Sequence, residues 1–317
     1  MAKVLLFFLL FLPLYLSANG HIFVYHRFDD TRYPTTNTSI KELRHEFNYF
    51  KTHNYKVVPL IDIVNKIKAH EKIPDNWVAL TIDDGFKTFY SNGLSVFKEF
   101  NYPFTLFIAV KYTEKKYKDY VSWKQLQEIV KYGNVEFHSY GHGHFGSMSD
   151  AEIKKDMDKG LALMKKYLNY EPNLFVYPYG EYDDRVEAVM EHYNFKALFN
   201  QNIGAVNGEC SNEYDLDRSA LVGKAPFKLY LKFKELCGVS FQQPTVFPKN
   251  KIVKTIEVTL EDKTIKSAEI FISNNGWTRV KVKDGKILWN ANKKVKLNRI
   301  KIGVKVKNKI KLMVLAK

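Results

Sequence analysis

Short apolar runs alternate with longer amphipathic segments over the first two thirds of the chain. Apolar runs of this length predict buried strands, whereas apolar residues that recur every three or four positions predict helices. Repeated alternation of strands and helices indicates a parallel sheet covered by helices. The expected strands cover residues 22–26, 56–60, 78–82, 104–110, 135–137, 174–177 and 197–199, and the expected helices cover 40–53, 60–69, 91–100, 122–131, 150–167 and 183–193.

The pattern changes after residue 250, where apolar and polar residues alternate in short stretches separated by Asn-Gly and Asp-Gly turn signals. This alternation predicts a small all-β domain with one solvated face. The residues just before it, Gln242 to Asn250, include two prolines and are typical of a linker. We therefore expect a larger α/β domain at 21–245 and an all-β domain at 250–317.

The net charge of +15 is concentrated in the expected all-β domain. Residues 249–317 contain 19 Lys and Arg but only five Asp and Glu. In residues 21–248 the positive and negative charges cancel. Rows of lysines on one face suit an anionic glycan or lipid surface. A basic surface that only keeps the domain soluble is the alternative. We expect no nucleic-acid partner.

The first 20 residues resemble a secretory signal peptide. Lys3 precedes an apolar run from Val4 to Leu16, and small residues that suit cleavage end at Gly20. This run is shorter than the roughly 20 residues that a membrane-spanning helix needs, so cleavage is favoured over a membrane anchor. We expect a periplasmic or extracellular protein. Its two cysteines, Cys210 and Cys237, either form a disulfide or remain free.

Three motifs with chemically useful side chains follow expected strands, and the carboxyl ends of parallel strands meet at one rim. Asp83 and Asp84 follow the strand at 78–82, where one carboxylate could bind a metal while its neighbour acts as a base. His138 and His142 lie four residues apart on a glycine-containing loop and could face one metal ion. Histidine and aspartate ligands suit Zn²⁺ best, with Co²⁺ and Ni²⁺ as alternatives.

The third motif is the turn Tyr177-Pro178-Tyr179-Gly180, which could present the backbone N–H of Tyr179 to an oxyanion. An ordinary connection from strand to helix is the simpler interpretation. We expect substrate contacts from this turn and from two nearby aromatic side chains. The expected substrate-binding residues are Pro178, Tyr179, Gly180, Tyr182 and Trp123.

Together the order Thr-Ile-Asp-Asp-Gly, His-Ser-x-x-His and Tyr-Pro-Tyr-Gly resembles the polysaccharide deacetylases, the carbohydrate esterases related to chitooligosaccharide deacetylase. The resemblance covers about residues 21–240. It implies a distorted (β/α) barrel that removes N-acetyl groups from N-acetylglucosamine polymers with a divalent metal. It also implies that Asp83 is the catalytic base and that Asp84, His138 and His142 are the metal ligands.

The sequence departs from this family at two positions. Val176 stands where the family usually has an arginine that orients the base, and Arg218 is our candidate replacement. The usual Leu-x-His strand near the end of the domain is missing, but Val24-Tyr25-His26 lies on the first expected strand, as in circularly permuted members that act on exported poly-N-acetylglucosamine. We therefore expect His26 to be the general acid. A histidine bonded only to Asp29 or Asp30 is the alternative.

The function that these features favour is metal-dependent deacetylation of an exported amino-sugar polysaccharide or of peptidoglycan. The alternative from another class is a non-catalytic glycan-binding protein that has kept a deacetylase-like barrel. A glycosidase is a third interpretation, but it would leave the histidine pair without a role.

Overall fold

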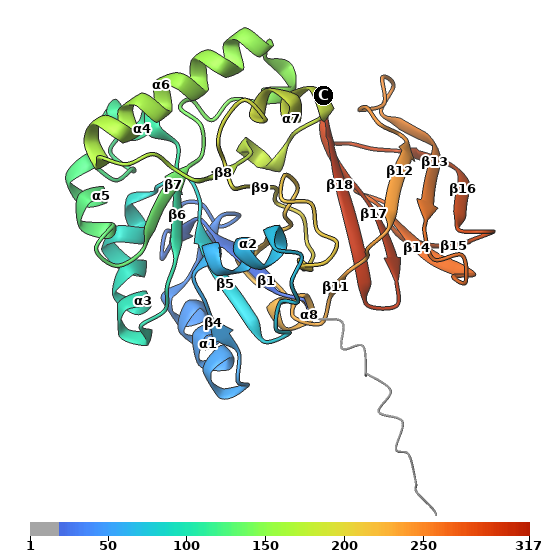
Figure 1. The fold of residues 1–317 in the computed structure, drawn as a ribbon, viewed down its shortest axis with the longest axis horizontal. Coiled ribbons are helices and arrows are strands. Elements are labelled where there is room, and N and C mark those ends of the chain that lie inside the picture. The colour runs from blue at the N-terminus through green and yellow to red at the C-terminus, as the bar shows by residue number, and fades with distance from the viewer. Residues whose placement is uncertain (1–18) are drawn as a thin grey trace, which may run out of the picture.

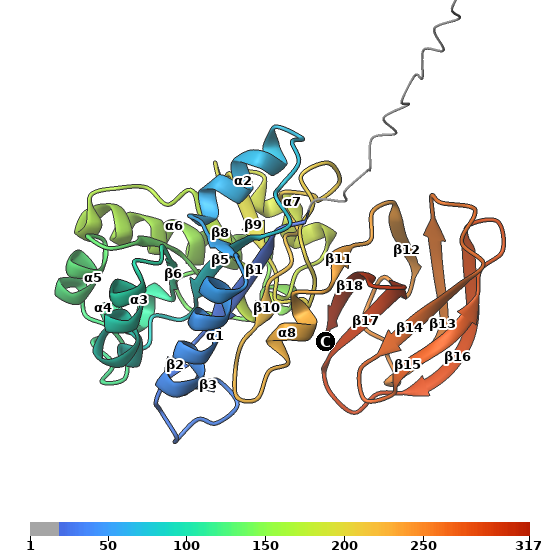
Figure 2. The ribbon, with the colours of Figure 1, turned by 90° about the horizontal axis from the view of Figure 1, so that it is seen from below.

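The computed structural model describes residues 19–317, which form a helix-covered parallel sheet followed by a separate all-β unit (Figures 1 and 2). The expected signal sequence therefore lies largely outside the described residues. Among the described residues, no helix is both long and apolar enough to cross a membrane.

The parallel sheet has the strand order β10-β1-β5-β6-β7-β8-β9, and β4 pairs with β5 beside this path. Its strands are short and almost entirely buried, because helices cover the outer face and side chains fill the interior. The strands are β1 (His21–Tyr25), β4 (Lys56–Val57), β5 (Trp77–Ile82), β6 (Thr105–Ile108), β7 (Asn134–Phe137), β8 (Leu174–Val176), β9 (Ala197–Phe199) and β10 (Ser219–Ala220).

A short irregular segment joins the two edges of this sheet. The backbone of Leu216 exchanges hydrogen bonds with Leu198 and Asn200 at the β9 edge. A few residues later, β10 pairs with β1 at the other edge. The sheet thus curves into a distorted barrel, as expected, and this segment brings Arg218 into its interior.

The six predicted helices begin and end close to the predicted positions, whereas α4 and α8 were not predicted. Serine side chains cap α1, α5 and α6, each in a reciprocal capping box with the third helical residue. The helix expected at 91–100 begins as a π-helical turn, η1 (Phe89–Gly93). The helices are α1 (Ile40–Thr52), α2 (Leu60–Lys68), α3 (Leu94–Phe100), α4 (Val110–Glu114), α5 (Trp123–Ile129), α6 (Asp150–Leu168), α7 (Asp184–Met190) and α8 (Phe227–Tyr230).

The all-β unit consists of a five-stranded sheet in the order β11-β18-β17-β14-β15 and a three-stranded sheet in the order β12-β13-β16. Inward-facing aliphatic side chains from both sheets form its core. Val239–Gln243, which includes part of the expected linker, is strand β12 and pairs with β13. The other strands are β11 (Lys234–Glu235), β13 (Ile252–Leu260), β14 (Ser267–Ile272), β15 (Gly276–Lys281), β16 (Lys286–Lys294), β17 (Arg299–Val306) and β18 (Lys309–Ala316).

The two units are packed together rather than joined by a free linker. A disulfide joins Cys210, which follows the barrel strand β9, to Cys237, which lies between β11 and β12. Lys311 of β18 lies 3.3 Å from Asp215 of the segment between β9 and β10. The expectation that the polar face of the all-β domain is entirely solvated is therefore wrong, because part of that face is buried against the barrel.

Candidate active site

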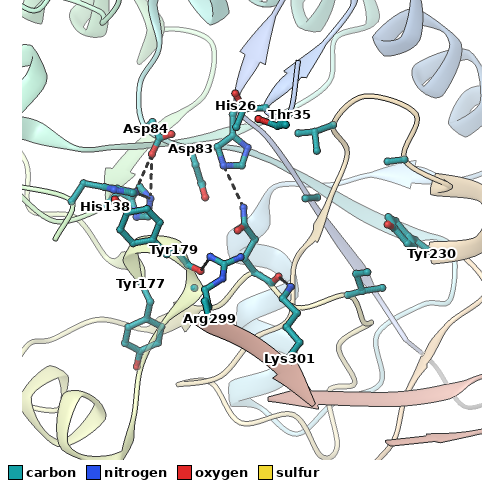
Figure 3. A pocket seen from close by; sticks show the side chains of 18 of the residues that line it. His26, Thr35, Asp83, Asp84, His138, Tyr177, Tyr179, Tyr230, Arg299 and Lys301 are labelled. Atoms are coloured by element: carbon teal, nitrogen blue, oxygen red, sulfur yellow. Dashed lines mark hydrogen bonds and ion pairs between the residues drawn. The ribbon is translucent and has the colours of Figure 1, made fainter. Parts of the chain in front are cut away.

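The carboxyl ends of β1, β5, β7 and β8 deliver the predicted chemical groups to one pocket of about 610 Å³ (Figure 3). Strand β5 leads into Asp83 and Asp84, β7 leads into His138, and β1 leads into His26. Strands β1 and β5 are parallel neighbours, with Tyr25 opposite Ile82. The first strand therefore does lie beside the aspartate strand, as the circularly permuted arrangement requires.

Asp84, His138 and His142 converge on one point. Oδ1 of Asp84 lies 3.5 Å from Nε2 of His138 and 3.2 Å from Nε2 of His142. The three ligand atoms lie within 4.8 Å of one another, which makes this group a candidate metal site. Burial raises the pKa of the Asp84 carboxyl, but the two histidines outweigh burial and hold that pKa well below its usual range.

The hydrogen bonds around this cluster suit a bound cation. Nδ1 of His138 lies 2.8 Å from the carbonyl oxygen of Val176 and therefore carries the proton, which leaves a lone pair on Nε2. That Nε2 lies 3.1 Å from Nε2 of His142, and the buried Oδ1 of Asp84 makes no hydrogen bond with any residue from 19 to 317. A divalent metal would satisfy all three atoms, so these residues fit the expected ion.

Several residues around the pocket have an unusual, left-handed backbone conformation. Asp84, Ser139, His142 and Tyr179 all have positive φ angles, between 53° and 70°. Non-glycine residues rarely adopt this conformation, which costs on the order of 1 kcal/mol each. The side chain of Ser139 offsets part of this cost, because its Oγ accepts a hydrogen bond from the His142 N–H at 2.8 Å. The fold thus holds the ligand loop in one shape.

The second aspartate has a different environment. Asp83 is buried, and both of its carboxylate oxygens accept hydrogen bonds from Arg218, at 2.8 and 2.7 Å. Burial raises the pKa of Asp83, and the guanidinium reverses this effect and lowers that pKa below its usual value. Arg218 also bonds Thr81 and the carbonyl of Asn200. Arg218 therefore makes the contact with Asp83 that is expected of a replacement for the arginine missing at Val176.

His26 lines the same pocket beside Asp83 (Figure 3). Its Nε2 lies 3.3 Å from Nε2 of Gln201, and its buried Nδ1 has no hydrogen-bond partner in the described part of the chain. The alternative partners are engaged elsewhere: Asp30 pairs with Arg27 and Arg32, and Asp29 accepts from a backbone N–H. Burial lowers the pKa of His26, and the two nearby aspartates oppose this effect. The imidazole therefore faces the pocket rather than the aspartates of the β1 loop.

The turn after β8 forms another wall of the pocket. Tyr179 has φ 61° and ψ 4°, and the N–H of Gly180 bonds the carbonyl of Tyr177 at 2.8 Å. The ring of His144 stacks on the Tyr179 ring with centroids 4.1 Å apart, and its Nδ1 lies 2.7 Å from Glu181. His144 thus supports the turn and does not belong to the metal cluster.

Two aromatic residues expected to bind substrate do not line the pocket. Trp123 lies on α5 and stacks on Tyr167, and Tyr182 stacks on Tyr177. Pro178 is buried within the turn. Sequence reasoning missed several lining residues, two of them from the all-β unit. The missed residues are Thr35, Thr36, Tyr177, Gln201, Ile203, Ala220, Val222, Lys224, Ala225, Tyr230, Arg299 and Lys301.

Residues 70–198 match the family model described as polysaccharide deacetylase. Poly-beta-1,6-N-acetyl-D-glucosamine N-deacetylase of Staphylococcus aureus (strain MSSA476) is 25% identical over 209 residues, which cover 62% of this chain and 71% of that protein. The Escherichia coli (strain K12) protein of the same name is 20% identical over 220 residues, covering 56% of this chain and 32% of its own length.

Two solved structures share the fold. The Streptococcus pyogenes deacetylase PplD in complex with acetate superimposes with a TM-score of 0.60 at 18% identity, covering 66% of this chain and 94% of that chain. IcaB from Ammonifex degensii gives a TM-score of 0.58 at 20% identity, and the match covers 67% of this chain and 94% of that chain. These likenesses confirm the distorted barrel.

Proposed function

We propose that this chain, whose residues 70–198 match the polysaccharide deacetylase family model, removes N-acetyl groups from an extracytoplasmic N-acetylglucosamine polysaccharide. The observation that carries the proposal is the complete site: a metal-type cluster of Asp84, His138 and His142 beside an arginine-held Asp83 in one pocket. A glycan-binding protein on a decayed barrel would have no need to keep these groups together.

The metal is proposed to be Zn²⁺, with Co²⁺ or Ni²⁺ as alternatives, held by Asp84, His138 and His142. When bound, such an ion would acidify a water molecule and polarise the acetamide carbonyl. The proposed base, Asp83, would act on the attacking water, and the proposed acid, His26, would act on the leaving nitrogen.

Asp83 is proposed to take a proton from the attacking water, whose oxygen forms a bond to the acetamide carbon. Its pairing with Arg218 keeps the carboxylate ionised and fixes its direction. The backbone N–H of Tyr179 would hold the oxyanion that forms on the acetamide oxygen. His26 would then protonate the departing nitrogen as the carbon–nitrogen bond breaks. The products are acetate and a free amine.

The polymer is proposed to be a β-1,6-linked N-acetylglucosamine chain, with peptidoglycan as the alternative. The support is the name shared by the two relatives and the first-strand position of His26. Export is proposed from residues 1–20 of the sequence. Binding of the basic all-β unit to an anionic glycan or lipid is a further proposal that rests on charge alone, and it predicts binding that weakens as salt increases.

An acetate-release panel tests the proposal. Zinc-loaded protein would be incubated with β-1,6-linked oligomers, chitooligosaccharides and peptidoglycan, with Asp83→Asn protein as the matched control. We expect acetate from the β-1,6 oligomers and at most a trace with the variant. Tight glycan binding without acetate from any of the three substrates would favour the non-catalytic alternative. Shortened glycan chains would favour a glycosidase.

A further inference from the structure

Strand β17 of the all-β unit reaches the active-site pocket of the barrel. Arg299 and Lys301 line this pocket together with Asp83, Asp84 and His26 (Figure 3). Along β17 the even-numbered residues Ile300 and Ile302 are buried in the core of their own unit. The odd-numbered side chains therefore point away from that core and, at 299 and 301, toward the barrel.

Arg299 holds the turn that contains Tyr179. Its Nη1 donates a hydrogen bond of 2.6 Å to the carbonyl oxygen of Tyr179, and its Nε lies 4.0 Å from Glu181. The peptide unit between Tyr179 and Gly180 is thus held at both ends, because its N–H already bonds the carbonyl of Tyr177. A left-handed conformation at Tyr179 is intrinsically unfavourable, so these two bonds help to maintain it.

Lys301 holds the neighbouring wall. Its ammonium group donates a hydrogen bond to the carbonyl oxygen of Gln201, whose side chain lies 3.3 Å from Nε2 of His26. The two walls also touch, because a Cβ atom on Gly180 would lie only 2.6 Å from the backbone nitrogen of Gln201. A shift of either segment would therefore disturb the other.

Two further contacts fix β18 against the barrel. Lys311 makes an ion pair with Asp215, and the buried side chain of Asn202 donates a hydrogen bond to the carbonyl oxygen of Leu312. The disulfide between Cys210 and Cys237 ties the same two units together. A module that served only for attachment would not need to place Arg299 and Lys301 in the lining of the pocket.

We propose that the all-β unit is an integral part of the active site, in which Arg299 is a positioning residue for the Tyr179 turn and Lys301 for the wall beside His26. This inference rests on the proposed deacetylase function. Because the Tyr179 N–H would act on the oxyanion, loss of Arg299 should affect the transition state more than the bound substrate. The rate constant kcat should fall while KM changes little.

The test compares Arg299→Met, Arg299→Lys and Lys301→Met with Lys305→Met in the full-length zinc-loaded protein. Lys305 lies on the same face of β17 but pairs with Glu269 at 3.0 Å and does not line the pocket. We expect Arg299→Met to lower kcat for a β-1,6-linked oligomer on the order of 10-fold with its metal retained. Arg299→Lys should recover part of the rate, and Lys305→Met should match the wild type.

Equal kcat values for Arg299→Met and the wild type would overturn the proposal, as would a loss of activity that tracks thermal stability alone. If Arg299→Met does not fold, Arg299→Lys and Lys301→Met decide the matter by the same criterion. Failure of the proposed deacetylase function would be recognised differently, because the wild-type protein itself would then release no acetate.

Discussion

Arg218 clamps both carboxylate oxygens of Asp83, although the two residues are 135 positions apart in the sequence. The guanidinium has no measurable solvent exposure, so the pair is shielded from water on the arginine side. Buried pairs with two-point geometry are rigid, and removing one partner leaves an uncompensated charge. The arginine therefore determines both the charge and the direction of the proposed base.

Asp83→Asn should retain bound metal and lose at least ~100-fold in deacetylation rate, the usual size of a general-base contribution. Arg218→Met should cause a similar loss by leaving Asp83 without its partner. Because the two side chains act as one unit, the double variant should be no slower than the slower single variant. Steady-state rates with metal analysis check this prediction. Metal loss in Asp83→Asn would show that the two aspartate roles are assigned wrongly.

Replacing His138 or His142 by Ala should remove bound metal and activity together, because each supplies one of three converging ligand atoms. His144→Ala is the matched control for metal content, since His144 bonds Glu181 and lies outside the cluster. Elemental analysis of the purified proteins measures the outcome. Full metal occupancy in His138→Ala would contradict the proposed ligand set.

His26→Gln should slow the hydrolysis of an N-acetylated oligomer with metal retained, because an amine leaves poorly without protonation. An activated aryl acetate has a leaving group that needs no proton, so its hydrolysis should be much less affected. The ratio of the two rates isolates the general-acid role from general damage to the pocket. If both substrates slow by the same factor, His26 does not act as the acid.

Glu46 should make stability depend on pH. Its buried carboxyl accepts a 2.8 Å hydrogen bond from Tyr25, and burial raises the pKa of Glu46 to about 8, with Glu42 of the same helix adding to the shift. Because the folded pKa lies above the unfolded value of 4.5, the folded state binds the extra proton. This contribution is complete below about pH 4.5 and is lost as the pH rises through about 8.

Glu46→Gln keeps an uncharged acceptor for Tyr25 and should remove this dependence. We expect the variant to be more stable than the wild type by at least ~1 kcal/mol at pH 8 and to lose that advantage at pH 5. Denaturant unfolding at the two pH values measures the difference. A constant gap between the two proteins at both pH values would argue against a raised pKa.

The barrel and the convergence of Asp84, His138 and His142 could be predicted from the sequence because both depend on local pattern. Apolar runs of strand length, separated by amphipathic helices, are sufficient to indicate a parallel sheet. In such a sheet the carboxyl ends of all strands lie on one rim, so residues that directly follow strands, such as Asp84, His138 and His26, must gather there. No knowledge of long-range packing is needed for this step.

The contacts that surround this cluster were decided by the tertiary structure, although Arg218 had been named from the sequence as a candidate. Arg218 reaches Asp83 because an irregular segment closes the barrel between β9 and β1, and no periodic pattern marks that segment. The alternation along β17 indicates which face of the strand is polar, but not whether water or another domain covers that face. From the sequence alone, Arg299 and Lys301 are therefore expected to be ordinary surface charges. Trp123 is the opposite case, because it was expected in the site but stacks on Tyr167 instead of reaching the pocket. Pairing between segments far apart in sequence depends on how whole elements dock, which one-dimensional periodicity does not specify.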